Sequence, residues 1–129
     1  MGALFIRVAV VYVVIGVLFG MVIGIMERFE FADVHAHINL LGWATLALAG
    51  LIYTLYPRAG SNRLAVWHFW LQNIGLPIFI IGLFLFNIIG RPAIPIISTG
   101  AIIAILGIIT FAINVLTNVR PLDARGSSV

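Results

Sequence analysis

The chain has 129 residues, of which 63% are hydrophobic and only 9% are charged, and its formal net charge is +3. A soluble domain carries roughly 25% charged residues, so this composition could not cover a water-facing surface. We therefore expect a single domain, residues 1–129, whose solvent is the lipid bilayer. The positive charges are all arginines and stand near the predicted loops, where they orient membrane helices, so no nucleic-acid binding is expected.

The chain contains no cysteine, which limits its chemistry. Disulfides, iron–sulfur clusters, thiolate copper centres and covalently attached c-type haem all require cysteine. Any haem must therefore be bound non-covalently.

Four apolar runs dominate the sequence. A membrane-spanning helix needs roughly 20 mostly apolar residues, and the runs at 4–26, 34–56, 64–89 and 94–117 meet that requirement. Short polar segments join them, so successive helices must run in opposite directions. The sequence predicts an all-α polytopic membrane protein, a four-transmembrane-helix antiparallel bundle.

Two of these runs carry small residues at helical spacing. The first has Gly16, Gly20 and Gly24, and the fourth has Gly100, Ala104 and Gly107. Such faces allow another helix, or a flat ligand, to approach closely. Because two such faces exceed the need of one small bundle, we expect a homo-oligomer.

The distribution of arginine predicts the orientation. One side of the membrane receives Arg7, Arg58, Arg63, Arg120 and Arg125, and the other receives Arg28 and Arg91. Cytoplasmic loops carry the excess of positive charge, so both termini are predicted to be cytoplasmic. His35 and His37 then lie near the outer surface, and His68 lies near the cytoplasmic surface.

The three histidines are the candidate ligands, because a neutral imidazole binds haem iron and other metals. His35 and His37 point about 200° apart on a regular helix, so both bind one ion, such as copper, only if the helix starts after His35. His37 and His68 stand about 20 Å apart along the membrane normal and cannot clamp one haem within a chain. Alternatively, His35 is a water-exposed interfacial residue, and His68 bonds a backbone carbonyl.

The sequence A-H-I-N-L-L-G-W at 36–43, followed by Tyr53 and Pro57, resembles the second transmembrane helix of the catalytic subunit of the haem–copper oxidase superfamily. The nitric oxide reductase branch is the most similar, because its histidine is also followed by one residue and then asparagine, here Asn39. Phe69-Trp70-Leu71 resembles the start of that subunit's third helix. The resemblance covers the family's first three or four helices and implies that His37 is an axial ligand of a low-spin haem near the outer face.

The family's other haem and copper ligands lie on later helices, so the resemblance implies no oxidase or reductase activity for this chain. It implies a small b-type haem protein of the bacterial inner membrane, related to electron transfer or to a diatomic gas such as NO or O2. The second axial ligand could be His35, a residue of another copy, water or a gas. Alternatives are a non-haem accessory or assembly subunit that binds a respiratory-chain partner, and a copper protein.

Further residues follow from a haem placed at His37. Arg28 and Arg91 are the arginines on the predicted His37 side, and a planar guanidinium suits a propionate carboxylate. Asn39 points away from the iron and is expected to pin a neighbouring helix. Gly42 and the face formed by Gly16, Gly20 and Gly24 are expected to let the porphyrin lie close to the backbone.

Overall fold

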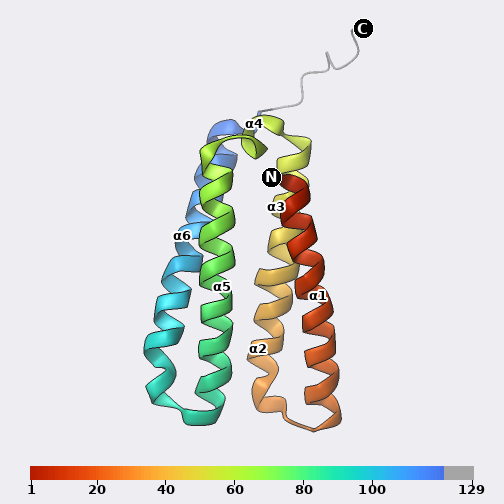
Figure 1. Cartoon of the computed structure of the whole chain (residues 1–129), viewed down its shortest axis with the longest axis vertical. Coiled ribbons are helices and arrows are strands. Elements are labelled where there is room, and N and C mark those ends of the chain that lie inside the picture. The colour runs from red at the N-terminus through yellow and green to blue at the C-terminus, as the bar shows by residue number, and fades with distance from the viewer. Residues whose placement is uncertain (121–129) are drawn as a thin grey trace, which may run out of the picture.

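The computed structural model describes residues 1–120, and in them every regular element is a helix (Figure 1). The elements in chain order are α1 (Gly2–Ile25), η1 (Phe29–Phe31), α2 (Ala32–His37), the π-helical segment η2 (Ile38–Ala44), α3 (Thr45–Leu55), α4 (Pro57–Gly60), α5 (Arg63–Ile89), η3 (Arg91–Ala93) and α6 (Ile94–Asn118).

Four helical stretches are long and apolar enough to cross a membrane: Gly2–Ile25, Phe29–Leu55, Arg63–Ile89 and Arg91–Asn118. The predicted fold, an all-α bundle of four transmembrane helices, is confirmed. The second span, Phe29–Leu55, begins earlier than the sequence predicted, because η1 and α2 continue the helical path into the expected loop. Arg125, which entered the orientation argument, lies outside the described residues.

The bundle consists of two hairpins, α1 with the second span and α5 with α6 (Figure 1). Glycines bring α5 and α6 into backbone contact. A Cβ atom on Gly100 would collide with the backbone of Phe79, and one on Gly82 would lie 2.7 Å from the backbone nitrogen of Ile97. The small residues of α6 are therefore used inside the chain, which removes the sequence argument that they provide an oligomer interface.

In the first hairpin, two glycines of α1 make room for side chains of the second span. A Cβ atom on Gly16 would lie 2.6 Å from the side chain of Asn39, and one on Gly20 would lie 2.5 Å from the ring of His35. Gly24 differs, because nothing lies within 4 Å of its Cβ position. Gly16 and Gly20 thus accommodate polar side chains of the second span and leave no room there for a porphyrin.

The seam, defined here as the contact between the two hairpins, is well packed near each end of the bundle. One cluster joins Phe5 of α1, Leu46 and Tyr53 of α3, and Phe69 of α5. At the other end Phe31 stacks on Phe84 of α5, with ring centroids 5.0 Å apart. Within residues 1–120, α5 lines two pockets that lie along the seam.

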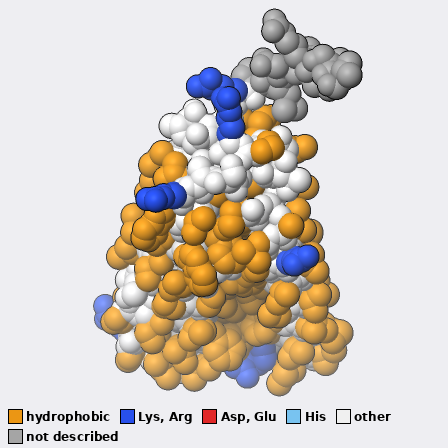
Figure 2. Space-filling view, turned by 45° about the horizontal axis from the view of Figure 1, so that its top comes forward, with side chains coloured by type: hydrophobic (Ala, Val, Ile, Leu, Met, Phe, Trp, Pro, Cys, Tyr) orange, Lys and Arg blue, Asp and Glu red, His pale blue; other side chains and the backbone are white. Residues whose placement is uncertain are grey.

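The outside of the bundle is apolar, as a lipid-facing surface requires. Large aliphatic side chains are exposed along all four long helices, and hydrophobic side chains cover much of the face shown in Figure 2. Because lipid cannot hydrogen-bond, the polar side chains of the spans have to find partners between helices or on the backbone of their own helix.

The contact between α5 and α6 can be tested with two matched substitutions. Gly100→Leu must push α6 away from Phe79, so we expect it to lower the stability of the folded protein by about 1–3 kcal/mol, the usual cost of overpacking. Gly24→Leu adds the same side chain at an open position and should change stability little. Thermal unfolding in mild detergent measures both, and equal midpoints for the two variants would contradict the packing.

Candidate functional site

His37 lies at the end of α2, immediately before the π-helical segment, and is half-buried. Its Nδ1 lies 2.8 Å from the main-chain oxygen of Asp33. A carbonyl oxygen can only accept a hydrogen bond, so Nδ1 must carry the proton. In the neutral imidazole the other ring nitrogen, Nε2, then has a lone pair. Metal-binding histidines commonly show this arrangement, in which a carbonyl fixes the tautomer and the ring orientation.

The segment Ile38–Ala44 is a π-helix, and such segments occur frequently at functional sites. Its wider turn is accompanied by a side-chain bond from the Thr45 hydroxyl to the carbonyl of Leu40, at 2.8 Å. Gly42 lies in this segment, and a Cβ atom there would lie 2.5 Å from the ring of Tyr12 on α1. Tyr12 therefore occupies the space beside Gly42 that was expected to admit a porphyrin.

A pocket of about 160 Å³ lies beside His37, between the second span, α5 and α6. Its lining comprises His37, Leu41, Gln72, Phe79, Ala101, Ala104, Ile105 and Ile108. The edge of the His37 ring meets Phe79, with centroids 5.0 Å apart. Gln72 is fully buried, and within residues 1–120 neither its amide nitrogen nor its amide oxygen has a hydrogen-bond partner. The pocket is thus apolar apart from one imidazole and one unpaired amide.

His35 faces α1, whereas His37 faces α5. The Nδ1 of His35 lies 2.9 Å from the main-chain oxygen of Gly16 on α1, so His35 is a helix-packing residue here and not water-exposed. Asn39 lies beside it and donates to the main-chain oxygen of His35 at 2.9 Å. As expected for Asn39, its side chain packs against α1, next to Gly16.

His35 and His37 therefore do not converge, since one is held against α1 and the other against α5. Among residues 1–120 no group of three or more histidine, cysteine, aspartate or glutamate side chains could hold a metal ion. A copper centre built on His35 and His37 has no geometric support in this structure.

His68 is fully buried near the end of the bundle that holds the N-terminus. Its Nδ1 lies 2.9 Å from the hydroxyl of Tyr53, and its ring lies between those of Phe5 and Phe111, at 4.8 and 4.9 Å. It thus bonds a side chain in the core instead of a backbone carbonyl at the interface. The two phenyl rings leave no space for a porphyrin against this imidazole.

Asn114 of α6 completes this polar cluster and was not identified from the sequence. Its amide donates to the main-chain oxygen of Ala59 at 2.9 Å and to the hydroxyl of Tyr53 at 3.3 Å, and it accepts from Asn62 at 2.7 Å. An asparagine inside an isoleucine-rich span was the available signal, because such residues bond across helices.

The two candidate propionate partners lie at the same end of the bundle as His37. Arg28 already pairs with Glu30 and stands 5.2 Å from the Phe31 ring centroid. Arg91 begins η3 and is exposed, and no salt bridge to it occurs among the described residues. Of the two arginines, Arg91 is therefore the more available to pair with a propionate.

Comparison with known proteins gives one partial similarity. A 51-residue stretch is 37% identical to cytochrome c oxidase subunit 1 of Rhodobacter capsulatus. The match covers 35% of this chain and only 10% of that subunit, so the chain spans about a tenth of its relative's length. No family model matches, and no solved structure matches. The similarity supports a relation to the haem–copper oxidases at most, and the closer likeness to the nitric oxide reductase branch is not shown.

The buried cluster around His68 predicts a stability effect. Tyr53→Phe removes the hydroxyl that bonds His68 and Asn114, so polar atoms are left unpaired in the core, at an expected cost of about 1–3 kcal/mol. Tyr56→Phe is the matched control at the half-buried end of the same span. Thermal unfolding in detergent should show a lower midpoint for Tyr53→Phe alone, and an unchanged midpoint would contradict the bonding of this cluster.

Proposed function

We propose that this protein is a small membrane protein that binds haem b, with His37 as an axial ligand of the iron. The observation that carries the proposal is the bond from His37 Nδ1 to the Asp33 carbonyl, which leaves a lone pair on Nε2 of a neutral ring that lines an apolar pocket. The partial similarity to an oxidase subunit adds support. Bound haem would supply either one-electron transfer or the binding of a diatomic gas.

The residues around His37 suit one face of a haem. Phe79, Leu41 and Ile105 offer apolar contacts. Ala101 and Ala104 have small side chains, so they leave space on the side of the pocket formed by α6. The pocket volume of about 160 Å³ is below the range of roughly 300–1,000 Å³ usual for small-molecule sites. One chain therefore encloses only part of a porphyrin. We propose that a second copy, or a respiratory-chain partner, covers the remainder.

The other axial position is left open by this chain. His35 bonds to Gly16 and His68 is enclosed in the core, so neither is placed to complete the coordination. We propose that a diatomic gas, water or a side chain of another subunit takes that position. Arg91, and Arg28 if it leaves Glu30, would hold the propionates at the polar boundary.

A second candidate function is a non-haem accessory subunit of a respiratory complex. The observation that favours it is the small volume beside His37, together with Gly16, Gly20 and Gly42 being occupied by side chains of this chain. A protein of this kind would pack against its partner through its apolar exterior and would be colourless. An optical spectrum separates the two functions.

The decisive variants are His37→Ala and His35→Gln, compared with the wild-type protein after purification in mild detergent. The wild type should show a Soret band, and a sharp α-band on reduction. His37→Ala should lose nearly all haem per protein because the iron loses its ligand. His35→Gln keeps an amide donor toward Gly16 and should retain the haem. Full haem content with an unchanged spectrum in His37→Ala would contradict the assignment, and a colourless wild type would support the accessory function.

We also propose that the protein lies in the bacterial inner membrane with its N-terminus in the cytoplasm, as the arginine distribution favours. Because the chain has no cysteine, single cysteines report topology cleanly. Glu30→Cys should react with a membrane-impermeant maleimide added to intact spheroplasts, and Ser61→Cys should react only after lysis. The reversed pattern would place His37 near the cytoplasmic surface.

A further inference from the structure

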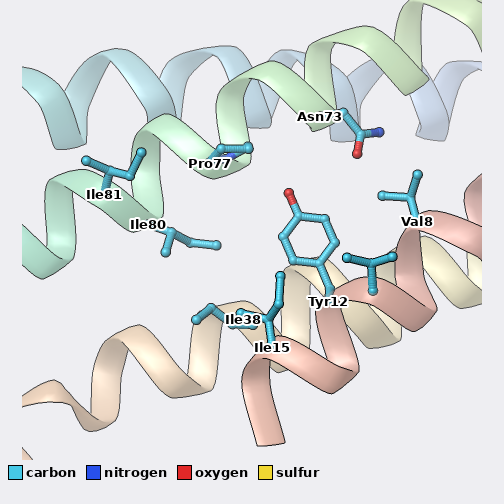
Figure 3. A pocket seen from close by; sticks show the side chains of 9 residues that line it. Val8, Tyr12, Ile15, Ile38, Asn73, Pro77, Ile80 and Ile81 are labelled. Carbon is cyan, nitrogen blue, oxygen red and sulfur yellow. The ribbon is translucent and has the colours of Figure 1, made fainter. Parts of the chain in front are cut away.

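The larger pocket of the seam lies away from His37 and is unrelated to the haem proposal. Its volume is about 400 Å³, and it is lined by Val8, Val11, Tyr12, Ile15, Ile38, Asn73, Pro77, Ile80 and Ile81. This volume lies within the range of small-molecule sites. Figure 3 shows Tyr12 and Asn73 extending into it from facing helices, with Pro77 beside them.

Tyr12 packs against the second span at this pocket. A Cβ atom on Gly42 would lie only 2.5 Å from its ring, so the second span blocks movement of the ring on that side. The hydroxyl consequently extends toward α5 (Figure 3). Among residues 1–120 no hydrogen bond occupies it, so it is free both to donate and to accept.

Asn73 supplies two hydrogen-bond acceptors on α5, its side-chain oxygen and its main-chain carbonyl, and Pro77 leaves the second one without a donor. The Asn73 amide nitrogen donates to the main-chain oxygen of Phe69 at 2.8 Å, which leaves the side-chain oxygen available. Pro77 lies inside α5 and has no N–H, so the main-chain carbonyl of Asn73, four residues earlier, lacks its usual helical donor. Unpaired acceptors are costly in an apolar site, and a ligand hydroxyl would pair with them.

The pocket opens to the hydrocarbon of the bilayer. Val11, Ile15 and Ile81 line it and are 57%, 50% and 55% exposed along the lipid-facing surface. A ligand must therefore enter laterally from the membrane and must be soluble there. Its walls are branched aliphatic side chains, the Tyr12 ring and the Pro77 ring, which suit the faces of a planar molecule.

We propose that this pocket binds a hydroxyaromatic compound dissolved in the bilayer. The ring would lie between the aliphatic walls. Its hydroxyl would donate its one hydrogen to either the side-chain or the main-chain oxygen of Asn73 and would accept from Tyr12. The proposal concerns binding and does not depend on haem. It predicts that a ligand with a hydroxyl donor binds better than the same ring without one.

The test measures 2-naphthol and 2-methoxynaphthalene binding to the full chain in lipid nanodiscs, after subtraction of partitioning into protein-free nanodiscs. Wild-type protein should bind naphthol saturably, with about one molecule per chain. The methyl ether should bind about tenfold more weakly, because it cannot donate a hydrogen bond. Absence of saturable naphthol binding, or equal affinity for the two probes, would overturn the proposal.

Three variants locate the site. Tyr12→Phe removes the hydroxyl and should weaken naphthol binding several-fold. Asn73→Leu removes the side-chain acceptor, and Pro77→Ala restores an N–H that occupies the Asn73 carbonyl, so whichever of these two variants removes the acceptor in use should also weaken binding several-fold. Tyr56→Phe lies outside the pocket and should bind like the wild type. His37→Ala should also retain binding, so a failure of the haem proposal would not affect this result. Unchanged affinity in all three pocket variants, or loss of binding only in His37→Ala, would refute the location.

Discussion

The constraint on which this structure depends is that a bilayer offers no hydrogen bonds to polar groups. Every polar side chain within the spans must therefore find its partner between helices or on its own backbone. His35 and Asn39 turn toward α1, and His68 and Asn114 form the core of one end with Tyr53. Gly16 and Gly20 of α1 make the first arrangement possible, because they leave room for the side chains of Asn39 and His35.

The same constraint marks the positions that are not fully satisfied. Gln72 is buried with both amide atoms unpaired, and the Asn73 carbonyl lacks its helical donor beside Pro77. These neighbours on α5 line different pockets, one next to His37 and one next to Tyr12. The two hairpins pack tightly near both ends and leave these spaces along the seam. A seam of this kind offers ligand sites without interrupting the helices.

The sequence predicted the four spans well, because long apolar runs leave few other solutions in a membrane. It also placed Asn39 against a neighbouring helix. The assignment of His37 as a haem ligand stays a prediction. The sequence did not predict the π-helical segment Ile38–Ala44, which packs against α1. As a result, the occupation of Gly42 by Tyr12 was not foreseen.

The histidines illustrate the same limit. From the sequence, His35 and His37 could share a metal if the helix started after His35, and His68 was expected at the membrane interface. The spacing of residues along a helix gives their relative directions, but it does not say which neighbouring helix each side chain contacts. The structure places His35 on α1 and encloses His68 between Phe5 and Phe111. The Tyr53 hydroxyl pairs with His68 Nδ1 and also accepts from Asn114, whereas His68 Nε2 has no hydrogen-bond partner among residues 1–120.

Haem binding at His37 depends most directly on the tautomer of its imidazole ring. Nitrogen-15 spectra of protein labelled at histidine, assigned by comparison with His37→Gln, report which ring nitrogen of His37 carries the proton. The structure predicts a protonated Nδ1 and an unprotonated Nε2 in the haem-free protein, with the Nε2 signal lost or strongly shifted when haem is added. A proton on Nε2, or a His37 spectrum indifferent to haem, would contradict the account.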